Sequence, residues 1–340
     1  MSYARGNQGY VMLSSAQSAI GTKATPVYTG TIAAGEDLKL VKPGKQVLVD
    51  RIRHNVAPTV VQSGKIHTEG TLTYDLIPDE ALGINLAMIA GSNNTVSGNA
   101  SVGYTHTFNF WSGCNDFGST GITIQKLVGG CTNAMLADFI GTFANTFELT
   151  VPEDGVCTYA VGYMGIKNAF AGSTLATPVY SSVSPFEGWM ATLSVGSLIG
   201  SVAAIAIKSC KLNIENNLQL LMDHNASNQY PSAVVPQSRK VTLEFEVSQE
   251  DSLTLYNYFL NDTKNAVQLT LTHSALAGSS SGAYSIVFKL PVVTWLGQEP
   301  TIDSADVLKG TYSMEALYDS VTGYDVQAVV VNSQSGVYTV

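Results

Sequence analysis

Charged residues are scarce in this sequence, and acidic residues outnumber basic ones. They make up 13% of the 340 residues, about half the usual share of roughly 25%. The formal net charge of −9 at pH 7 argues against a protein that grips nucleic acid, because phosphate binding needs clustered Lys and Arg. A surface with so few charges is expected to lie partly against other subunits.

Motifs that mark enzymes are also missing. The chain has no Gly-x-Ser-x-Gly elbow, phosphate-binding loop, dinucleotide fingerprint or His-Glu-x-x-His helix. The histidines are scattered, and a solvated or hydrogen-bonded ring is a simpler interpretation of each than a catalytic base; they are His54, His67, His106, His224 and His273. We therefore expect neither catalysis nor a cofactor.

Metal-ligand spacing and long apolar runs are absent too. The cysteines form no Cys-x-x-Cys pair, so free thiols are predicted rather than a zinc site, with disulfides only in an oxidising medium; they are Cys114, Cys131, Cys157 and Cys210. The polar start of the chain does not resemble a secretion signal. Residues 193–207, the longest apolar stretch, are too short to span a bilayer. We expect a cytosolic product without a membrane partner.

Period-two alternation of apolar and polar residues is frequent and predicts a mainly β protein. The clearest strand-like segments are 146–151, 211–214, 241–247, 284–290 and 325–331. Runs rich in Gly, Ser and Asn separate such segments and predict loops at 91–103, 225–238 and 277–282.

Two short helices are predicted, each directly after an alternating strand. The first begins within residues 77–80 (IPDE) and stops at Gly91, and the second begins within 248–251 (SQED) and continues to Leu260. Their acidic pairs are assigned capping and helix-dipole roles rather than acid–base catalysis. The pairs are Asp79/Glu80 and Glu250/Asp251.

The two strand–helix units align with each other. Residues 68–91 match residues 239–262 without a gap at an offset of 171, half the chain length, with identities at Thr71/Thr242, Leu72/Leu243 and Leu82/Leu253. The match predicts an internal duplication. We expect an N-terminal arm at 1–45 and two tandem domains at 46–185 and 186–340.

Short motifs in a fixed order resemble the tail tube proteins of long-tailed bacteriophages (siphophages). Residues 18–26 (SAIGTKATP) resemble the opening of that family, and 64–91 resemble its Gly-strand-helix-Gly unit. Further matching pieces follow in the same order at 104–110, 122–127, 131–151, 209–217, 239–258 and 289–319. The resemblance covers most of the chain, and the order of the motifs carries more weight than any one of them.

The resemblance implies two tail-tube-like β-sandwich or barrel domains, each with a short flanking α-helix, in a structural virion protein. Family members form rings that stack into a hollow tube, through which double-stranded DNA passes without specific binding. The implied location is the virion tail, assembled in the host cytoplasm, with other tail proteins as partners at tip and neck. The alternatives are another virion shell component, such as a capsid or decoration protein, or a β-sandwich binding module.

The resemblance also suggests a ring geometry, and the sequence offers two candidate surfaces for it. If a ring holds six tube domains, three two-domain chains would close it with pseudo-sixfold symmetry. The connection 222–238 is long enough to be a ring-stacking loop, with Met222, Asn225, Tyr230, Val235 and Ser238 as candidate residues. The polar faces of two alternating strands are candidates to line the lumen: Glu69, Thr71, Thr73 and Asp75, then Lys240, Thr242, Glu244 and Glu246. Alternation alone does not distinguish such a wall from an outward, solvated face.

Overall fold

The structure, a computed structural model, describes residues 9–33, 37–41, 47–48, 61–62, 65–110, 120–129, 135–170, 175–222, 229–248, 254–297 and 309–340. These residues are mainly β, as predicted, with two α-helices, α1 (Leu82–Ala90) and α2 (Thr254–Leu260), and the 3-10 helices η2 (Gly188–Met190) and η3 (Ile199–Ser201). The earlier strands are β1 (Tyr10–Ser14), β2 (Pro26–Gly30), β3 (Lys39–Val41), β4 (Val47–Leu48), β5 (Val61–Gln62), β6 (His67–Asp75), β7 (Thr95–Asn99), β8 (Gly103–Asn109), β9 (Ile122–Val128), β10 (Met135–Val151) and β11 (Thr158–Phe170). The later strands are β12 (Ala191–Gly196), β13 (Val202–Ile205), β14 (Ser209–Glu215), β15 (Gln219–Leu221), β16 (Ala233–Val235), β17 (Lys240–Ser248), β18 (Asn265–Leu276), β19 (Ala283–Trp295), β20 (Lys309–Leu317) and β21 (Gln327–Asn332).

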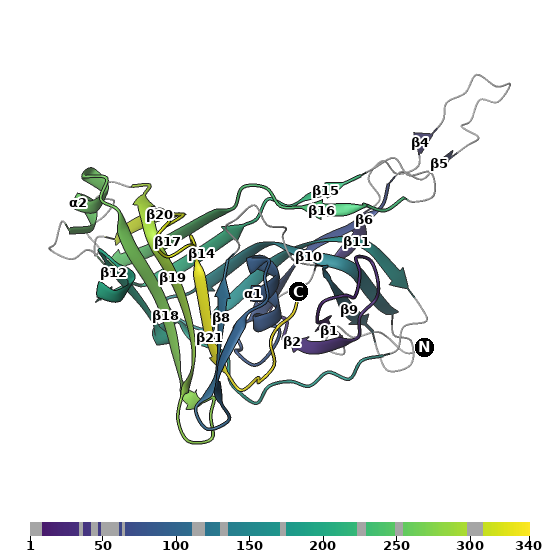
Figure 1. The fold of residues 1–340 in the computed structure, drawn as a ribbon, viewed down its shortest axis with the longest axis horizontal. Helices are drawn as coiled ribbons and strands as arrows, with labels where there is room; N and C mark the ends of the chain where they lie inside the picture. The colour runs from purple at the N-terminus through teal and green to yellow at the C-terminus, as the bar shows by residue number, and fades with distance from the viewer. Residues whose placement is uncertain are drawn as a thin grey trace.

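One large antiparallel sheet contains every described strand except the hairpins β4–β5 and β15–β16 (Figure 1). In the first half, neighbouring strands follow the order β2-β1-β9-β10-β11-β6-β3. The second half has the order β13-β12-β18-β19-β20-β17-β14. The two runs are joined where β10 pairs with β14. β21 pairs with β19 on one side and with β8, which is in neither run, on the other. The sheet therefore branches at β10 and at β19.

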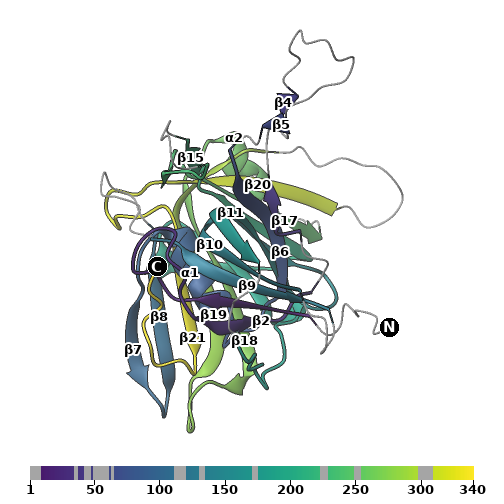
Figure 2. The ribbon, with the colours of Figure 1, turned by 90° about the vertical axis from the view of Figure 1, so that its right-hand side faces the viewer.

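Two of the three runs predicted as loops contain strand. β7 lies within 91–103, and β16 lies within 225–238. β7 is mostly exposed and is held by backbone pairing with β8, so it shows no apolar alternation that a sequence could display. Residues 277–282 do form a turn, and Ser279 N donates to Ala100 O across to the β7–β8 tip. These joined tips lie at the end of the molecule opposite to β15–β16 (Figures 1 and 2).

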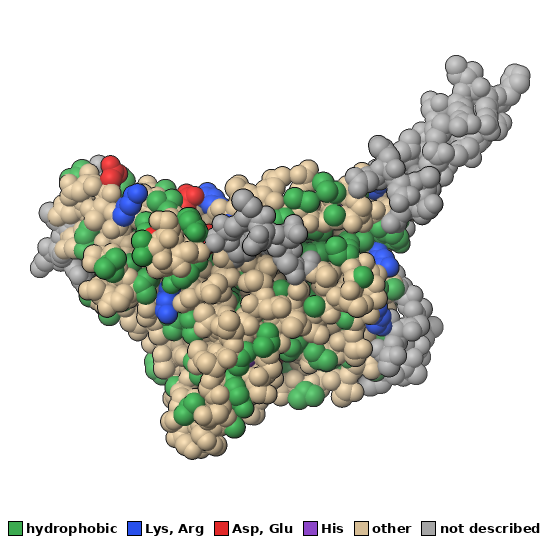
Figure 3. Space-filling view, in the orientation of Figure 1, with side chains coloured by type: hydrophobic (Ala, Val, Ile, Leu, Met, Phe, Trp, Pro, Cys, Tyr) green, Lys and Arg blue, Asp and Glu red, His purple; other side chains and the backbone are tan. Residues whose placement is uncertain are grey.

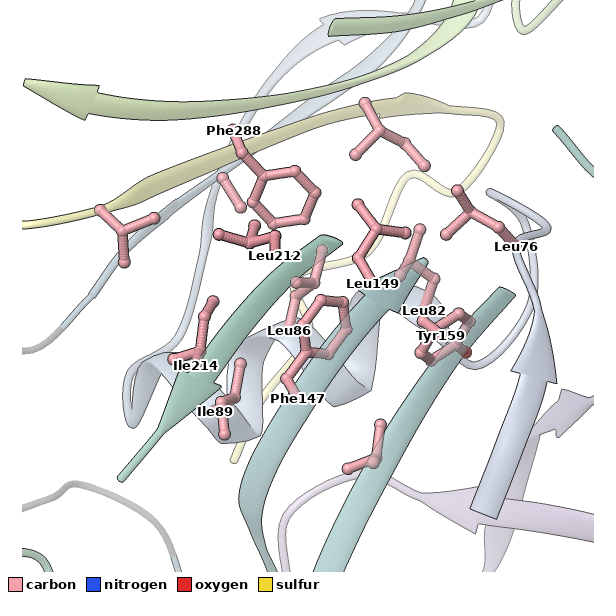
Figure 4. Packing of buried hydrophobic residues seen from close by; sticks show 14 of the residues in the cluster. Leu76, Leu82, Leu86, Ile89, Phe147, Leu149, Tyr159, Leu212, Ile214 and Phe288 are labelled. Carbon is pink, nitrogen blue, oxygen red and sulfur yellow. The ribbon is translucent and has the colours of Figure 1, made fainter. Parts of the chain in front are cut away.

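The core lies between α1 and the sheet and contains side chains from both halves of the chain (Figure 4). Members labelled in Figure 4 are Leu76, Leu82, Leu86, Ile89, Phe147, Leu149, Tyr159, Leu212, Ile214 and Phe288. Every residue of α1 is buried, and the helix stops where Gly91 adopts φ 67°, a left-handed conformation that suits glycine. The predicted stop is confirmed, whereas the helix begins at Leu82 rather than at 77–80.

Asp79 and Glu80 do not cap α1, contrary to the prediction. The N-cap residue is Ala81, without a side-chain cap. Asp79 accepts hydrogen bonds from Ser333 N and Oγ, both at 2.9 Å, and from Tyr284 Oη at 2.6 Å. Glu80 accepts from the backbone N of residues 31 and 181 at 2.8 and 3.2 Å. Both carboxylates bind segments that are remote in sequence, which local capping rules do not consider. The second acidic pair lies outside the described residues.

Residues 332–340, here called the C-terminal clasp, pack back on α1. Tyr338 is buried, and a Cβ added at Gly83 would lie 2.2 Å from its Cζ atom. Tyr338 N donates to Asn94 Oδ1 at 2.7 Å, and Val340 N donates to Asn93 Oδ1 at 3.0 Å. The end of the second half therefore completes the cover of the first-half helix.

The clasp is expected to weaken in acid. His106 is buried, with Nδ1 2.7 Å from Asn94 Nδ2 and Nε2 2.8 Å from Gln334 O, so a neutral ring accepts from the amide and donates to the carbonyl. Burial lowers the pKa of His106 below its ordinary value of 6.5. The unfolded chain therefore binds a proton at His106 more tightly than the folded chain does. The contribution of neutral His106 to the free energy of unfolding is present above pH 6.5 and is lost as the pH falls. Between pH 7.5 and 5, Tm should fall more in the native protein than in His106→Gln; equal falls would contradict this role.

Candidate functional surfaces

The predicted alternation of β6 and β17 is confirmed by burial. In β6, Leu72 and Tyr74 are fully buried, whereas Glu69, Thr71, Thr73 and Asp75 are partly or well exposed. In β17 the buried side chains are Val241, Leu243, Phe245 and Val247. Those at least partly exposed are Lys240, Thr242, Glu244 and Glu246. Each strand therefore contributes one face to the core and keeps one polar face outside it.

These two polar faces form one continuous surface. Residues directly opposite each other in neighbouring strands lie on the same side of a sheet. One such row is Asp75–Thr158–Thr150–Lys211–Glu244–Ser313. The next row is Thr73–Ala160–Glu148–Asn213–Thr242–Glu315. All eight predicted lumen residues thus lie on one side of the run β6-β11-β10-β14-β17-β20, which we call the polar face.

Acidic side chains outnumber basic ones on the described part of the polar face. The carboxylates are Glu69, Asp75, Glu148, Glu215, Glu244, Glu246 and Glu315, and the ammonium groups are Lys211 and Lys240. Lys39 lies opposite Glu69 on the adjoining strand β3. Lys211 Nζ lies 3.0 Å from Glu148 Oε2, where β10 meets β14. Burial raises the pKa of Asp75. A surface with this balance attracts phosphate weakly, if at all.

The segment predicted to be a ring-stacking loop or hairpin contains β16, which forms a hairpin with β15. β15 pairs with β16, placing Gln219 opposite Val235 and Leu221 opposite Ala233. Tyr230 packs with Phe143, Ile166 and Leu218 in a small apolar cluster, whereas Val235 is 40% exposed. Met222 O accepts a hydrogen bond from Lys65 Nζ, and Ser238 O accepts one from Asn217 Nδ2. Asn225 lies outside the described residues.

A second hairpin, β4–β5, was missed by the sequence analysis. It is inserted between β3 and β6, just as β15–β16 is inserted between β14 and β17. Both hairpins lie at the same end of the molecule (Figures 1 and 2). Ile66 N donates to Gln229 O at 2.9 Å, so the chain leaving one hairpin is bonded to the other. Residues 63–64 and most of 42–60 are outside the described part. In the sequence, only the alignment of 68–91 with 239–262 could have indicated this hairpin, because it places the segment before β6 opposite the segment before β17.

Other sites found no support in the described residues. No His, Cys, Asp and Glu side chains gather there in a group of three or more that could hold a metal ion. Cys157 and Cys210 are free and buried, whereas Cys114 and Cys131 lie outside the described part. No described helix is long and apolar enough to cross a membrane. The face seen in Figure 3 carries few charged side chains.

Comparison with family models relates the sequence to a known family. A family model described as phage tail tube protein matches residues 6–316, nearly the whole chain. No curated protein matches the sequence.

Proposed function

The chain belongs to the phage tail tube protein family, and from that membership we propose that it forms stacked rings through which double-stranded DNA reaches the host. Members of this family are structural proteins of the virion tail, not enzymes, and self-assemble into a tube. The proposal includes assembly in the host cytoplasm and contacts with other tail proteins at the tip and neck.

The polar face is the proposed wall of the lumen. The observation that carries this assignment is its continuity across both halves, because a tube wall must continue from domain to domain. Its excess of carboxylates would repel DNA weakly across water, within a Debye length of about 8 Å at physiological salt. The competing interpretation, an outward solvated face, predicts that a reconstruction of the tube places Glu244 and Thr73 on the outer surface.

We also propose that the chain is an internal duplication of a tube domain. The supporting observation is that the two strand orders correspond at every step. In this correspondence β1–β2 matches β12–β13, β3 matches β14, β6–α1 matches β17–α2, and β9-β10-β11 matches β18-β19-β20. It supports counting β1–β3 with the first unit, which would shorten the predicted N-terminal arm. Among the described strands, the β7–β8 hairpin and β21 have no counterparts.

Aromatic packing supports the duplication residue by residue. In the first half, Tyr159 stacks on Tyr74 at 5.0 Å and on Phe147 at 5.6 Å between ring centroids. At matching positions of the second half, Tyr312 lies 5.7 Å from Phe245 and 6.1 Å from Trp295. Tyr74 and Phe245 differ by the same offset of 171 found in the sequence. A superposition in which Thr71 and Thr242 do not coincide would count against the proposal.

The same correspondence supports the proposed ring of three copies by indicating which strand edges of neighbouring copies would pair. The halves join where Thr146 of β10 lies opposite Glu215 of β14. Thr146 corresponds to Thr294 of β19, because each lies two strands from the aligned Thr71 or Thr242. Glu215 corresponds to Lys39 of β3, which occupies the matching position beside β6. We therefore propose that the edge of β19 at Thr294 pairs with the β3 edge of the next copy.

A cysteine pair tests this junction. Directly opposite residues have Cβ atoms about 4.5–5.5 Å apart, close enough for a disulfide after small movements. The double variant Thr294→Cys, Lys39→Cys should form covalent oligomers that end at closed trimers on a non-reducing gel. The matched control is Thr294→Cys with Lys240→Cys, which lies on the polar face away from the β3 edge. A ladder ending at six chains would refute the threefold ring.

Electron microscopy of the purified protein tests the assignment itself. A tube protein should polymerise into hollow cylinders as its concentration rises. Discrete particles at every concentration would favour the decoration-protein or binding-module alternatives. Cylinders whose mass per ring equals six chains would support the tube assignment but refute the ring of three two-domain chains.

A further inference from the structure

Two turns are locked together at the end of the molecule opposite to the β15–β16 hairpin (Figures 1 and 2). We call them the joined tips: residues 99–102, where β7 turns into β8, and residues 276–282, where β18 turns into β19. Ser279 N donates to Ala100 O at 2.9 Å, and the next two backbone N–H groups donate to Ser101 O at 3.0 and 3.1 Å. The backbones of the two turns therefore support each other, and the tips are pre-organised for a partner.

The joined tips expose apolar side chains and carry no charge. Val102 is 43% exposed and Leu276 is 51% exposed. Residues 91–103 and 274–283 contain no Asp, Glu, Lys, Arg or His. The centre of a protein interface is depleted of charged residues in the same way. A partner can therefore cover the tips without leaving an unpaired charge in the contact.

The β15–β16 hairpin presents a matching surface. In its register, Leu221 and Val235 belong to the same face, and both side chains are exposed. Val234, on the opposite face, packs against the cluster that contains Phe143 and Ile166. One face thus anchors the hairpin to its own chain, and the other is left for a partner.

Charge selects between the two hairpins of the chain. The described residues of the β15–β16 hairpin, 219–222 and 229–235, contain no charged side chain. The insertion that carries β4–β5, residues 42–65, contains five cationic residues, which are Lys42, Lys45, Arg51, Arg53 and Lys65. The joined tips offer no carboxylate to such cations, and burying a cation without a partner is costly. The tips therefore suit β15–β16 and not β4–β5.

Stacking of identical rings requires that one end of the chain fits a surface on its other end. The hairpin and the joined tips lie at such opposite ends, and in Figure 2 the ends of β7–β8 and β18–β19 lie below β15. We infer that the joined tips receive the β15–β16 hairpin of a chain in the adjacent ring, an inference that rests on the proposed stacked rings. Val102 and Leu276 then cover Leu221 and Val235, and the serines of the tips form a polar rim.

Crosslinking tests the contact in assembled tubes. A short bismaleimide, which does not demand disulfide geometry, should link chains of the double variant Leu276→Cys, Val235→Cys into products larger than one ring. The matched control is Val321→Cys with Val235→Cys, which moves one thiol to the exposed turn between β20 and β21. It should give less product by about tenfold or more. The native chain, with its four cysteines, sets the background, and equal yields in the two double variants would overturn the inference.

A charge pair tests the named occupant. Leu276→Asp should raise the critical concentration for polymerisation by about tenfold or more, because it buries an unpaired carboxylate in the contact. Adding Val235→Lys to the same chain should restore polymerisation, since every contact then pairs a carboxylate with an ammonium group. Adding Val321→Lys instead should not. The Tm of the dilute subunit should change little, because Leu276 is half exposed in the single chain.

The outcomes separate the docking from the tube proposal. Polymerisation of Leu276→Asp at the native critical concentration refutes the docking and leaves the tube proposal intact. A loss that Val235→Lys does not relieve assigns the joined tips to another partner and overturns the named occupant. Failure of the native chain to form tubes refutes the tube proposal, and the docking with it.

Discussion

Deleting residues 226–235 should yield a folded subunit that no longer polymerises. The deletion removes β16 and Tyr230, and with them the β15–β16 hairpin that extends from one end of the molecule. The main sheet and core contain neither strand, so the far-ultraviolet circular dichroism and the cooperative unfolding should persist. Tube formation, followed by light scattering and electron microscopy, should be abolished at concentrations where the native chain assembles.

A milder variant separates stacking from folding. Leu221 and Val235 are 37% and 40% exposed on the two strands of the hairpin, so Leu221→Asp, Val235→Asp keeps the backbone pairing but charges its apolar surface. The matched control is Val321→Asp, at a residue that is 91% exposed in the turn between β20 and β21. If the hairpin variant formed tubes as readily as the control, β15–β16 would not be part of the stacking interface.

Replacing Glu244 and Glu246 with lysine should leave tubes intact but slow or stall DNA ejection. Both residues lie on the polar face, and in every ring the change would place ammonium groups next to passing phosphates. Each close ammonium–phosphate contact releases counterions, so retention should grow steeply as salt is lowered. Ejection triggered in vitro from particles carrying the variant, measured from low to high ionic strength, gives the comparison.

An equal change of charge elsewhere is the control for this variant. Glu153 and Asp154 are exposed in the turn between β10 and β11, outside the rows of the polar face. Their replacement by lysine should leave ejection unaffected. Glu244 lies opposite Lys211, so a lysine there also adds a like-charge pair costing about 0.2–1 kcal/mol, which thermal unfolding would detect. Ejection at the native rate at every ionic strength would exclude β17 from the lumen.

Local patterns predicted the strands well because burial on one face imposes a period of two. β6 and β17 follow their predicted alternation throughout. The end of α1 at Gly91 was also predicted correctly, because the C-terminal cap of a helix depends on the residue that directly follows it. Asp79 and Glu80 were misassigned because their true partners, such as Ser333 and Thr31, are brought close only by the tertiary fold.

The continuity of the polar face could not be predicted for a similar reason. Alternation identifies two faces on each strand, but not which faces of distant strands coincide. That depends on the pairing of β10 with β14, whose six-residue register from Thr146 to Val151 is a contact between the two halves. The hairpin β4–β5 was missed because its two-residue strands carry too little sequence to show any period.

The C-terminal clasp also constrains when a newly made chain becomes complete. A ribosome delivers β1 to β11 long before residues 332–340, yet α1 packs against Tyr338 and Asp79 binds Ser333. Until residues 332–340 are translated, the first half therefore keeps part of its helix uncovered, and long-range pairing of this kind folds slowly. A chain that stops before residue 332 lacks this cover, so the contact between the clasp and α1 distinguishes chains that contain residues 332–340 from shorter ones before they meet a growing polymer.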